Sequence, residues 1–361
     1  MHIVIGLGKT GLSVVNFLHR CQIKEILVLD SRDNPPGLEE LRTRFPHIRV
    51  ELGQFSAALL QQASQLIISP GVSLQEPAIK QALEHGVPVV GDIELFAHEV
   101  KKPVVAITGS NGKSSVTTLV GEMAKNAGLK VAVGGNIGTP ALDLLNQDYD
   151  CYVLELSSFQ LETTSSLALR AAVILNISED HMDRYQALQE YIAAKQRIYR
   201  HCQQPVINKD DHLSWQGMQF ETPPWVFSSR EVVMEKQGPH AKKIDETQFY
   251  LLCRKGDIYL ANGEQALLPI HDIYLKGQHH LENALAALAL GKALDLPISV
   301  MLETLKNFKG LSHRCQWVAE LNHVTWYNDS KATNVGAALA AIISLGANLN
   351  DKKLILIAGG D

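Results

Sequence analysis

The chain has 361 residues, enough for two or three domains with a sizeable core. Hydrophobic residues make up 46% and charged residues 20%, as in an ordinary globular protein. The net charge of −5 argues against a general nucleic-acid or anionic-membrane partner.

The five cysteines are scattered, without a CxxC pair or a metal-ligand spacing, as in a reduced intracellular protein. The first residues lack the basic and apolar regions of a signal peptide, and no apolar run is long enough to span a membrane. We therefore expect a cytoplasmic protein without a membrane partner.

Short β-branched runs alternate with helical periodicity, which predicts a parallel sheet covered by helices. The first strands are predicted at Ile3–Ile5, Ile26–Leu29, Leu66–Ile68 and Val87–Val90. Each run ends in a turn or a polar segment. Functional groups in such sheets gather at the carboxyl ends of the strands.

A GxGxxG motif, Gly6-Leu7-Gly8-Lys9-Thr10-Gly11, follows the first strand, and Asp30 ends the second. The spacing is typical of dinucleotide binding, so an NAD-dependent oxidoreductase is one interpretation. Any nucleotide diphosphate could use the same helix N-terminus. Glycines that only allow close helix–strand packing are an equally good interpretation.

A second glycine-rich segment, the phosphate loop Thr108–Ser114, follows a predicted strand at Val104–Ile107. A helix with a continuous apolar face comes next. Glycines permit the tight turn, a lysine neutralises phosphate oxygens and a serine hydroxyl suits Mg²⁺, which together predict ATP binding. Ile107 breaks the common GxxxxGK[ST] spacing, and a polar turn with a solvent-exposed lysine is the alternative.

Further strands are predicted at Val131–Val133, Tyr152–Leu154, Ala172–Leu175 and Val206–Ile207. Glu155 follows one of them, where it could hold Mg²⁺ or stabilise a helix start. His181 follows another among acidic residues, and a structural histidine is as good an interpretation as a catalytic one. Lys195 lies in a helical segment and reads by spacing alone as a surface lysine.

Alternating segments from Pro223 to Ile270 predict antiparallel hairpins, with turns at Lys255-Gly256-Asp257 and Asn262-Gly263. Helical periodicity returns at Glu282–Leu294. A third block near Gly310 has predicted strands at Val324–Tyr327 and Leu354–Ile357 and ends at Gly359-Gly360-Asp361. Two strands and one helix make a poor domain, so we expect a truncated C-terminus.

Several long strings occur in one order along the chain: ITGSNGKSSVTTLVGEMAK, VGGNIGTPAL, YVLELSSFQLETT, LNISEDHMDRY, NALAALAL and YNDSKATNVGA. With these strings the chain resembles the Mur ligases, and most closely the members that add D-glutamate. The resemblance covers essentially the whole chain. It implies an α/β fold with a Rossmann-like domain at 1–91 that binds the UDP substrate. A central P-loop ATPase domain with small antiparallel hairpins at 92–309 and an incomplete Rossmann-like domain at 310–361 would follow.

The resemblance also implies a reaction in peptidoglycan precursor synthesis, and so a role in cell-wall biogenesis, cell shape and cell division. ATP, with Mg²⁺, would phosphorylate the carboxylate of UDP-N-acetylmuramoyl-L-alanine. The amine of D-glutamate would then attack the acyl phosphate and form an amide. The protein is expected to act as a monomer.

The residues of this chain that match functional positions of the family are the implied site residues. Those for ATP are Gly109, Ser110, Asn111, Gly112, Lys113, Ser114, Ser115, Asn283, Arg314 and Asp329. Those for the UDP substrate are Gly8, Thr10, Asp30, Ser31, Arg32, Ser69, Gly71, Asn136 and Ser157. The implied metal ligands are Ser114, Glu155, His181 and carbamylated Lys195, and the implied catalytic residues are Lys113, His181 and Lys195.

Two departures from the family stand out. Ser115 stands where threonine is commoner. The family's third domain also continues beyond such a Gly-Gly-Asp and carries lysine and serine groups that grip D-glutamate. If Asp361 is the true end, we expect weak or no ligation, and a non-catalytic nucleotide-binding fragment is the further alternative.

Overall fold

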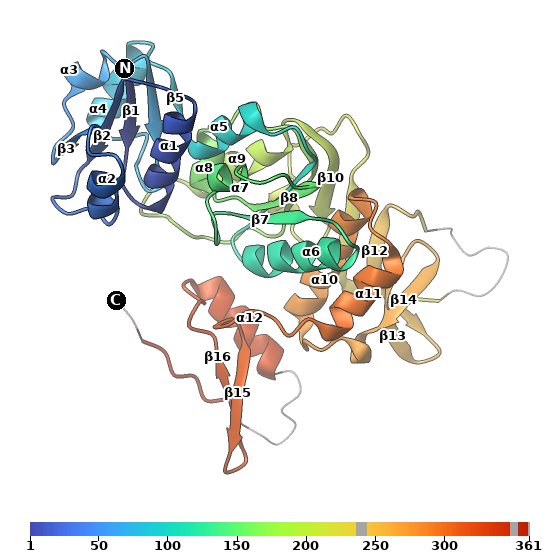
Figure 1. Cartoon of the computed structure of the whole chain (residues 1–361). Helices are drawn as coiled ribbons and strands as arrows, with labels where there is room; N and C mark the ends of the chain where they lie inside the picture. Colours follow the sequence, from blue (N-terminus) through green and yellow to red (C-terminus); the bar gives the residue numbers. More distant parts are fainter. Residues whose placement is uncertain (236–243, 347–352, 360–361) are drawn as a thin grey trace. The chain divides into compact units, whose positions relative to one another are not determined.

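The computed structural model describes residues 1–235, 244–346 and 353–359 (Figure 1). The chain divides into two compact units, each built from several segments. The first contains Met1–Thr108, Lys130–Arg170 and Asp183–Gln203. The second contains Gly109–Leu129, Ala171–Met182 and Gln204–Asp361.

The first unit opens with a wholly parallel sheet in the order β3-β2-β1-β4-β5. Its strands are β1 (His2–Ile5), β2 (Ile26–Asp30), β3 (Arg49–Leu52), β4 (Gln65–Ile68) and β5 (Val89–Val90). Four of these were predicted. The edge strand β3 was missed because Arg49 and Glu51 interrupt its apolar character.

Helices cover this sheet, which explains why consecutive strand residues are apolar. Ile3, Val4 and Ile5 are all fully buried, although successive side chains of a strand point to opposite faces. The helices are α1 (Lys9–Arg20), α2 (Leu38–Arg44), α3 (Ala57–Leu60) and α4 (Pro77–Glu84), whereas α5 (Asp92–Glu99) contacts helices that come later in the unit (Figure 1).

The first unit also contains three parallel strands in the order β6-β8-β7, with β8 between its neighbours. They are β6 (Val104–Thr108), β7 (Val131–Gly135) and β8 (Cys151–Glu155). Ile107 and Gly135 both lie beside Glu155, so this carboxylate sits at the carboxyl end of the strands. The accompanying helices are α7 (Ala141–Leu144), α8 (Ser158–Glu162), α9 (Leu188–Gln196) and η1 (Arg197–Tyr199).

The second unit carries strands in the order β9-β10-β11-β12-β13-β14. The unit contains most of β9 (Leu169–Ile174) and of β10 (Cys202–Asn208). It contains all of β11 (Trp225–Met234), β12 (Gln248–Arg254), β13 (Asp257–Asn262) and β14 (Gln265–Pro269). The antiparallel pairs β12–β13 and β13–β14 confirm the predicted hairpins. However, β11 pairs in parallel with both of its neighbours, which the hairpin prediction did not include.

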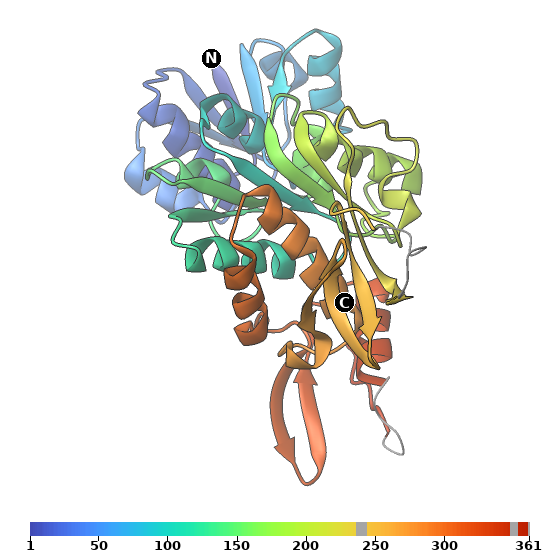
Figure 2. The same cartoon turned by 90° about the vertical axis from the view of Figure 1, so that its right-hand side faces the viewer.

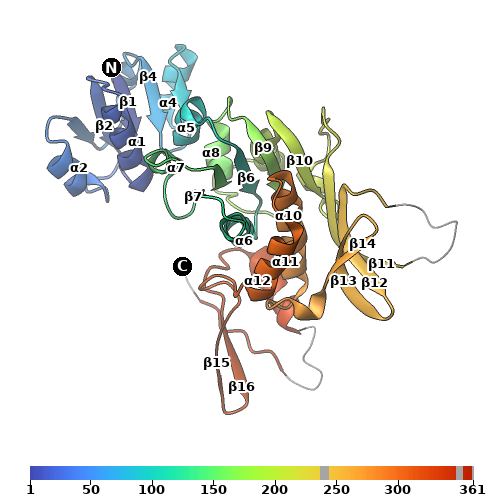
Figure 3. The same cartoon turned by 45° about the vertical axis from the view of Figure 1, so that its right-hand side comes forward.

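Helix α6 (Lys113–Asn126) packs against α10 (Gln278–Ala293) and α11 (Ile298–Asn307) in the same unit (Figure 3). The apolar face predicted for α6 is buried, with Val116, Val120 and Met123 fully covered. Helix α10 begins before the predicted Glu282. Short 3₁₀ helices lie at η2 (His212–Ser214) and η3 (Ile270–Asp272).

After α11 the chain forms the antiparallel hairpin β15 (Gln316–Leu321) and β16 (Val324–Asn328), and then α12 (Val335–Gly346) (Figure 2). The strand predicted at Leu354–Ile357 is wrong, because these residues have no regular secondary structure. Ile355 and Ile357 are 80% and 79% exposed, so the apolar run that suggested a buried strand is uncovered. Residues 347–352 and 360–361, which belong to the predicted third domain, lie outside the described residues.

No helix in the described part of the chain combines the length and apolar character needed to cross a bilayer.

Replacing Gly11 by alanine should destabilise the fold by at least about 2 kcal/mol, because overpacking against backbone forces a shift. The added Cβ would lie 1.9 Å from the carbonyl oxygen of Gly6. Urea denaturation followed by circular dichroism measures the change. Gly8→Ala is the control, since a Cβ there meets no atom within 4 Å. Equal stabilities of the two variants would contradict this crowding.

Candidate functional site

The phosphate loop leaves β6 and leads directly into α6. Gly109 and Gly112 have φ angles of +149° and +84°, a region that L side chains rarely adopt. A Cβ on Gly112 would also lie 2.7 Å from Oδ1 of Asn283. The loop therefore needs glycine at both positions, and it lies next to Asn283, one of the residues predicted for ATP.

Two cationic side chains lie on the loop. The Lys113 ammonium donates to the carbonyls of Gly109 and Ser110, at 2.8 and 2.9 Å. Arg314 donates through Nη2 to the Ser114 hydroxyl at 2.9 Å. Together with the backbone N–H groups at the start of α6, these charges make the loop suited to a phosphate group.

The loop is held by the segment after β9. The backbone N–H groups of Ser110 and Asn111 donate to the carbonyl and the side-chain oxygen of Asn176, both at 2.8 Å. Asn176 donates back to the Asn111 carbonyl at 3.2 Å. Ser110 and Ser178 exchange two further bonds of 2.9 Å. Sequence reasoning missed Asn176, whose only signal was a polar residue directly after a buried strand.

His181 follows this segment with a φ of +57°, a strained backbone region for a residue other than glycine. Its side chain is 47% exposed, and Nε2 lies 3.7 Å from the Asp180 carboxylate. Asn334 donates to both Asp180 and Asn111, at 3.3 and 3.2 Å. The histidine is thus presented to solvent beside an acid that is itself tied to the loop.

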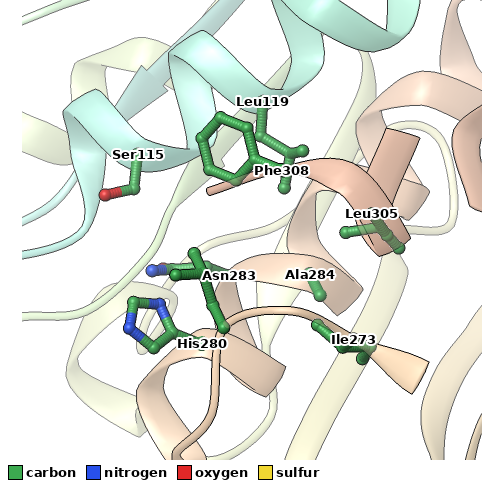
Figure 4. Close-up of a pocket in the computed structure, with 9 residues that line it drawn as sticks. Ser115, Leu119, Ile273, His280, Asn283, Ala284, Leu305 and Phe308 are labelled. Carbon is green, nitrogen blue, oxygen red and sulfur yellow. The ribbon is translucent and has the colours of Figure 1, made fainter. Parts of the chain in front are cut away.

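A pocket lies between α6, α10 and the residues that follow α11 (Figure 4). Its lining is mainly apolar, with Leu119, Leu305 and Phe308, and it includes the predicted ATP residues Ser115 and Asn283. Burial, together with the neighbouring His279, lowers the pKa of His280 to about 3, so this imidazole is neutral. The pocket is therefore small, mainly apolar and without a charged side chain in its lining.

Asp329, another predicted ATP residue, accepts a hydrogen bond of 3.0 Å from the backbone N–H of Cys315. Cys315 directly follows Arg314 in the chain. Asp329 therefore helps to hold the segment that carries the arginine.

In the first unit, Glu155 is the last residue of β8 and is only 2% exposed. Its Oε1 accepts a hydrogen bond of 2.7 Å from Nδ2 of Asn136. Its Oε2 is buried and has no hydrogen-bond partner within the described ranges. A buried carboxylate oxygen without a donor is costly unless a cation satisfies it, so this residue fits a metal ligand.

Lys195 is also in the first unit and is only 1% exposed, so its interpretation as a surface lysine is wrong. Its Nζ donates to the Thr108 hydroxyl at 3.3 Å and lies 4.6 Å from the centre of the Tyr191 ring. The lysine is buried in the apolar surroundings of α9, and the spacing of residues in the sequence could not predict this burial. Burying an ammonium is costly, which favours a chemically special role.

In the described residues, no three His, Cys, Asp or Glu side chains cluster as a metal centre. The predicted ligand set contains a serine hydroxyl and a lysine, which such a cluster would not include. Metal binding therefore stays a prediction for Ser114, Glu155, His181 and Lys195.

The GxGxxG segment forms a glycine turn, Gly6–Gly11, held mainly by Asp30. The Asp30 carboxylate accepts hydrogen bonds from Leu7 N–H at 2.6 Å and from Arg32, with Nη2 at 2.7 Å and Nε at 2.8 Å. Burial acts to raise the pKa of Asp30, but these bonds outweigh it and leave the pKa below its ordinary value. Both carboxylate oxygens already have partners within the protein, which disfavours their use on a ribose.

Other predicted substrate residues lie around the turn or beside Glu155. Ser69 donates to the Gly6 carbonyl at 2.9 Å, and Gly71 follows it in the chain. Gly8 and Thr10 lie at the start of α1, while Ser31 and Arg32 are exposed after β2. Ser157 caps α8 through a reciprocal pair of hydrogen bonds with Gln160. The structure thus brings the turn, Asp30 and Ser69 together.

Glu282, which directly precedes Asn283 on α10, was not predicted as a site residue. Its Oε1 accepts a hydrogen bond of 3.0 Å from Asn208. Burial raises its pKa from 4.5 to about 7; nearby Asp210 and Asp211 add to this rise. Because the folded protein binds this proton more tightly than the unfolded chain, stability should fall as the pH rises from about 4.5 to about 7.

Glu282→Gln should therefore stabilise the protein by about 2 kcal/mol at pH 8 and have little effect below pH ~4.5. Thermal unfolding at several pH values measures the difference. Glu221→Gln, at an exposed position, controls for the loss of one negative charge. A stability difference for Glu282→Gln that does not change with pH would contradict the assignment.

Two family models match the chain. "Mur ligase MurD-like, N-terminal domain" matches residues 1–91, and "Mur ligase middle domain" matches residues 107–291. Among solved structures, UDP-N-acetylmuramate-alanine ligase MurC from Thermotoga maritima is 21% identical, with a TM-score of 0.56 over 97% of this chain and 78% of that one. A pseudomurein peptide ligase type C from Methanothermus fervidus is 19% identical, with a TM-score of 0.53 over 95% and 76%. These likenesses confirm the predicted α/β fold class.

Curated relatives are much more similar in sequence. The UDP-N-acetylmuramoylalanine--D-glutamate ligase of Pseudomonas putida is 52% identical over 359 residues, which are 99% of this chain and 77% of that protein. The enzymes with the same name from Pseudomonas aeruginosa and Coxiella burnetii are 51% and 49% identical, with the same coverage. With these matches, the chain belongs to the Mur ligase family.

Proposed function

We propose that the chain is an ATP-dependent ligase that adds D-glutamate to UDP-N-acetylmuramoyl-L-alanine in peptidoglycan precursor synthesis. The observation that carries the proposal is the glycine-constrained phosphate loop with Lys113 and Arg314 on it, in a member of the Mur ligase family. The names of relatives about half identical over nearly the whole chain support the choice of substrates.

A carboxylate is a poor electrophile because its leaving group would be oxide. In the proposed reaction, a carboxylate oxygen of the substrate attacks the γ-phosphorus of ATP, and ADP leaves. The amine of D-glutamate then attacks the acyl carbon, loses a proton and expels phosphate. Lys113, Arg314 and the N-terminus of α6 neutralise the charge that moves between these phosphate oxygens.

The pocket beside α10 is the proposed place for adenine. Asn283 offers an amide that can both donate and accept hydrogen bonds, and Ser115 offers a hydroxyl. Phe308 and Leu119 supply apolar surface for the ring faces. The neutral imidazole of His280 adds no charge that would have to be desolvated when an uncharged base binds.

Glu155 is a proposed ligand of Mg²⁺ in the first unit. Ser114 and His181 are proposed ligands of Mg²⁺ in the second unit. Bound Mg²⁺ would neutralise phosphate charge and hold the phosphates in line for transfer. The buried, unpartnered Oε2 of Glu155 supports this part of the proposal. Carbamylation of Lys195, in which its amine adds to CO₂ and loses a proton, would turn a buried cation into an anionic oxygen ligand.

The glycine turn, with Thr10, Ser69 and Arg32 around it, is the proposed cradle for UDP. We keep the division into domains at 1–91, 92–309 and 310–361 as part of this proposal. We also propose a monomer that acts in the cytoplasm, where its nucleotide substrates occur, without nucleic-acid or membrane partners.

The NAD-dependent alternative is not favoured. Asp30, the residue that would have to bind the ribose, has both oxygens bonded within the protein. The phosphate loop and the buried Glu155 would also have no use in hydride transfer.

The complete gene product should release phosphate only when ATP, Mg²⁺, UDP-N-acetylmuramoyl-L-alanine and D-glutamate are all present. Lys113→Ala should lower this rate at least about 1,000-fold, because charge stabilisation at the transferred phosphate is lost. Binding of the UDP substrate, measured by calorimetry, should remain. Failure of the unsubstituted protein to release phosphate in response to D-glutamate would refute the proposed function.

Glu155→Gln should raise the Mg²⁺ concentration for half-maximal activity at least about tenfold, because an amide oxygen is a weaker ligand than a carboxylate. The matched control is Glu99→Gln, which removes a carboxylate at an exposed position in the same unit. An unchanged Mg²⁺ dependence of Glu155→Gln would argue against its role as a metal ligand.

A further inference from the structure

Arg184 lies three residues after His181 and joins two parts of the first unit that are far apart in sequence. Its Nη1 donates to the Pro70 carbonyl at 2.7 Å, and its Nη2 to the Val72 carbonyl at 3.1 Å. Nη2 also forms an ion pair of 3.2 Å with Glu162, and both side chains are less than a fifth exposed. One guanidinium thus holds the loop after β4 and helix α8 at the same time.

The contact depends on the planar shape of arginine. The guanidinium carbon lies 3.9 Å from the centre of the Phe159 ring, and Phe159 also belongs to α8. The ring in turn stacks on Tyr185, with centres 5.9 Å apart and planes inclined by 22°. A lysine carries a compact ammonium and could not serve two carbonyls, a carboxylate and a ring face from one position.

The loop held by Arg184 packs directly against the glycine turn. A Cβ on Gly6 would lie 2.8 Å from Cβ of Ser69 and 3.2 Å from Cγ2 of Val72. Val72 N–H donates to the Ser69 carbonyl at 2.9 Å. With so little free space, the loop and the turn move together, so holding the loop to α8 also fixes the distance between the turn and α8.

The other end of the contact lies on α8, which follows a residue proposed for Mg²⁺ and a residue predicted for the UDP substrate. Helix α8 begins directly after Ser157, its N-cap, and Glu155 precedes Ser157 by two residues. The arginine therefore links the loop next to the proposed UDP cradle with the helix that follows the proposed magnesium ligand.

We propose that Arg184 is a positioning residue that fixes the Pro70–Val72 loop to α8 and so sets the spacing between the UDP cradle and the segment carrying Glu155 and Ser157. This inference rests on the proposed function. The UDP substrate must reach both regions at once, so its productive binding depends on that spacing.

The test compares Arg184→Lys with the unsubstituted complete gene product. The value of kcat/KM for UDP-N-acetylmuramoyl-L-alanine should fall at least about tenfold, because misplacement of a bound substrate costs rate. The Kd of UDP alone should change less than about twofold, because Asp30 and Ser69 still hold the turn. The KM of ATP should also stay within about twofold.

Arg197→Lys is the matched control. Arg197 donates to the carbonyls of Leu161 and Thr164, at 2.6 and 2.9 Å, and so holds the same helix without touching the loop. It should lower the unfolding temperature while leaving the ratio of kcat/KM to UDP affinity unchanged. If Arg197→Lys alters that ratio as much as Arg184→Lys does, the effect is general loosening of α8 and the proposal is overturned.

The proposal is also overturned if kcat/KM of Arg184→Lys equals that of the unsubstituted protein. The same holds if kcat/KM and the affinity for UDP fall by the same factor in this variant. If Arg184→Lys does not fold, Phe159→Leu replaces it, because this variant removes the ring face and leaves the hydrogen-bonding groups of Arg184 in place. A smaller loss of kcat/KM with unchanged UDP affinity supports the proposal, and no loss refutes it. A wild-type protein without ligase activity would instead refute the proposed function.

Discussion

The reciprocal hydrogen bonds between the phosphate loop and the segment after β9 are the constraint on which the second unit depends. A loop with two glycines at positive φ has many accessible conformations and a high entropic cost of ordering. Asn176 and Ser178 satisfy its backbone and side-chain groups in both directions, which selects one conformation. The start of α6, the position of Lys113 and the approach of Arg314 all follow from that choice.

The first unit buries charged groups in two different ways. Asp30 is saturated with donors from Leu7 and Arg32, so its charge has a structural use. Glu155 and Lys195 are buried as deeply, but Glu155 keeps one oxygen without a partner among the described residues. This contrast separates an acid that maintains the fold from one with capacity left for a ligand.

Much of the fold was predictable because buried parallel strands leave continuous apolar runs, as in β1 and β6. The prediction failed where tertiary context decides. The edge strand β3 is too polar to stand out, and the apolar run Leu354–Ile357 forms no strand. A run of apolar residues indicates that the segment tends to be buried. It becomes a strand of a sheet only where a neighbouring strand pairs with it.

The site shows the same division. The phosphate loop and Glu155 were visible from glycine spacing and strand ends. The burial of Lys195 and the bonds of Asn176 and Arg184 arise from segments distant in sequence, which spacing cannot report. Resemblance to the family supplied expected roles for matching positions, but it offered nothing for Arg184.

The contact between Arg314 and Ser114 has a consequence for how the protein matures. The two residues are separated by 200 positions, so the loop receives this second cation only after a long stretch of chain has been synthesised and folded. Lys113, by contrast, bonds to carbonyls three and four residues away and can do so as soon as α6 forms. A nascent chain on the ribosome would thus have its local lysine in position well before the arginine arrives, which delays full charge neutralisation until the late segments have docked.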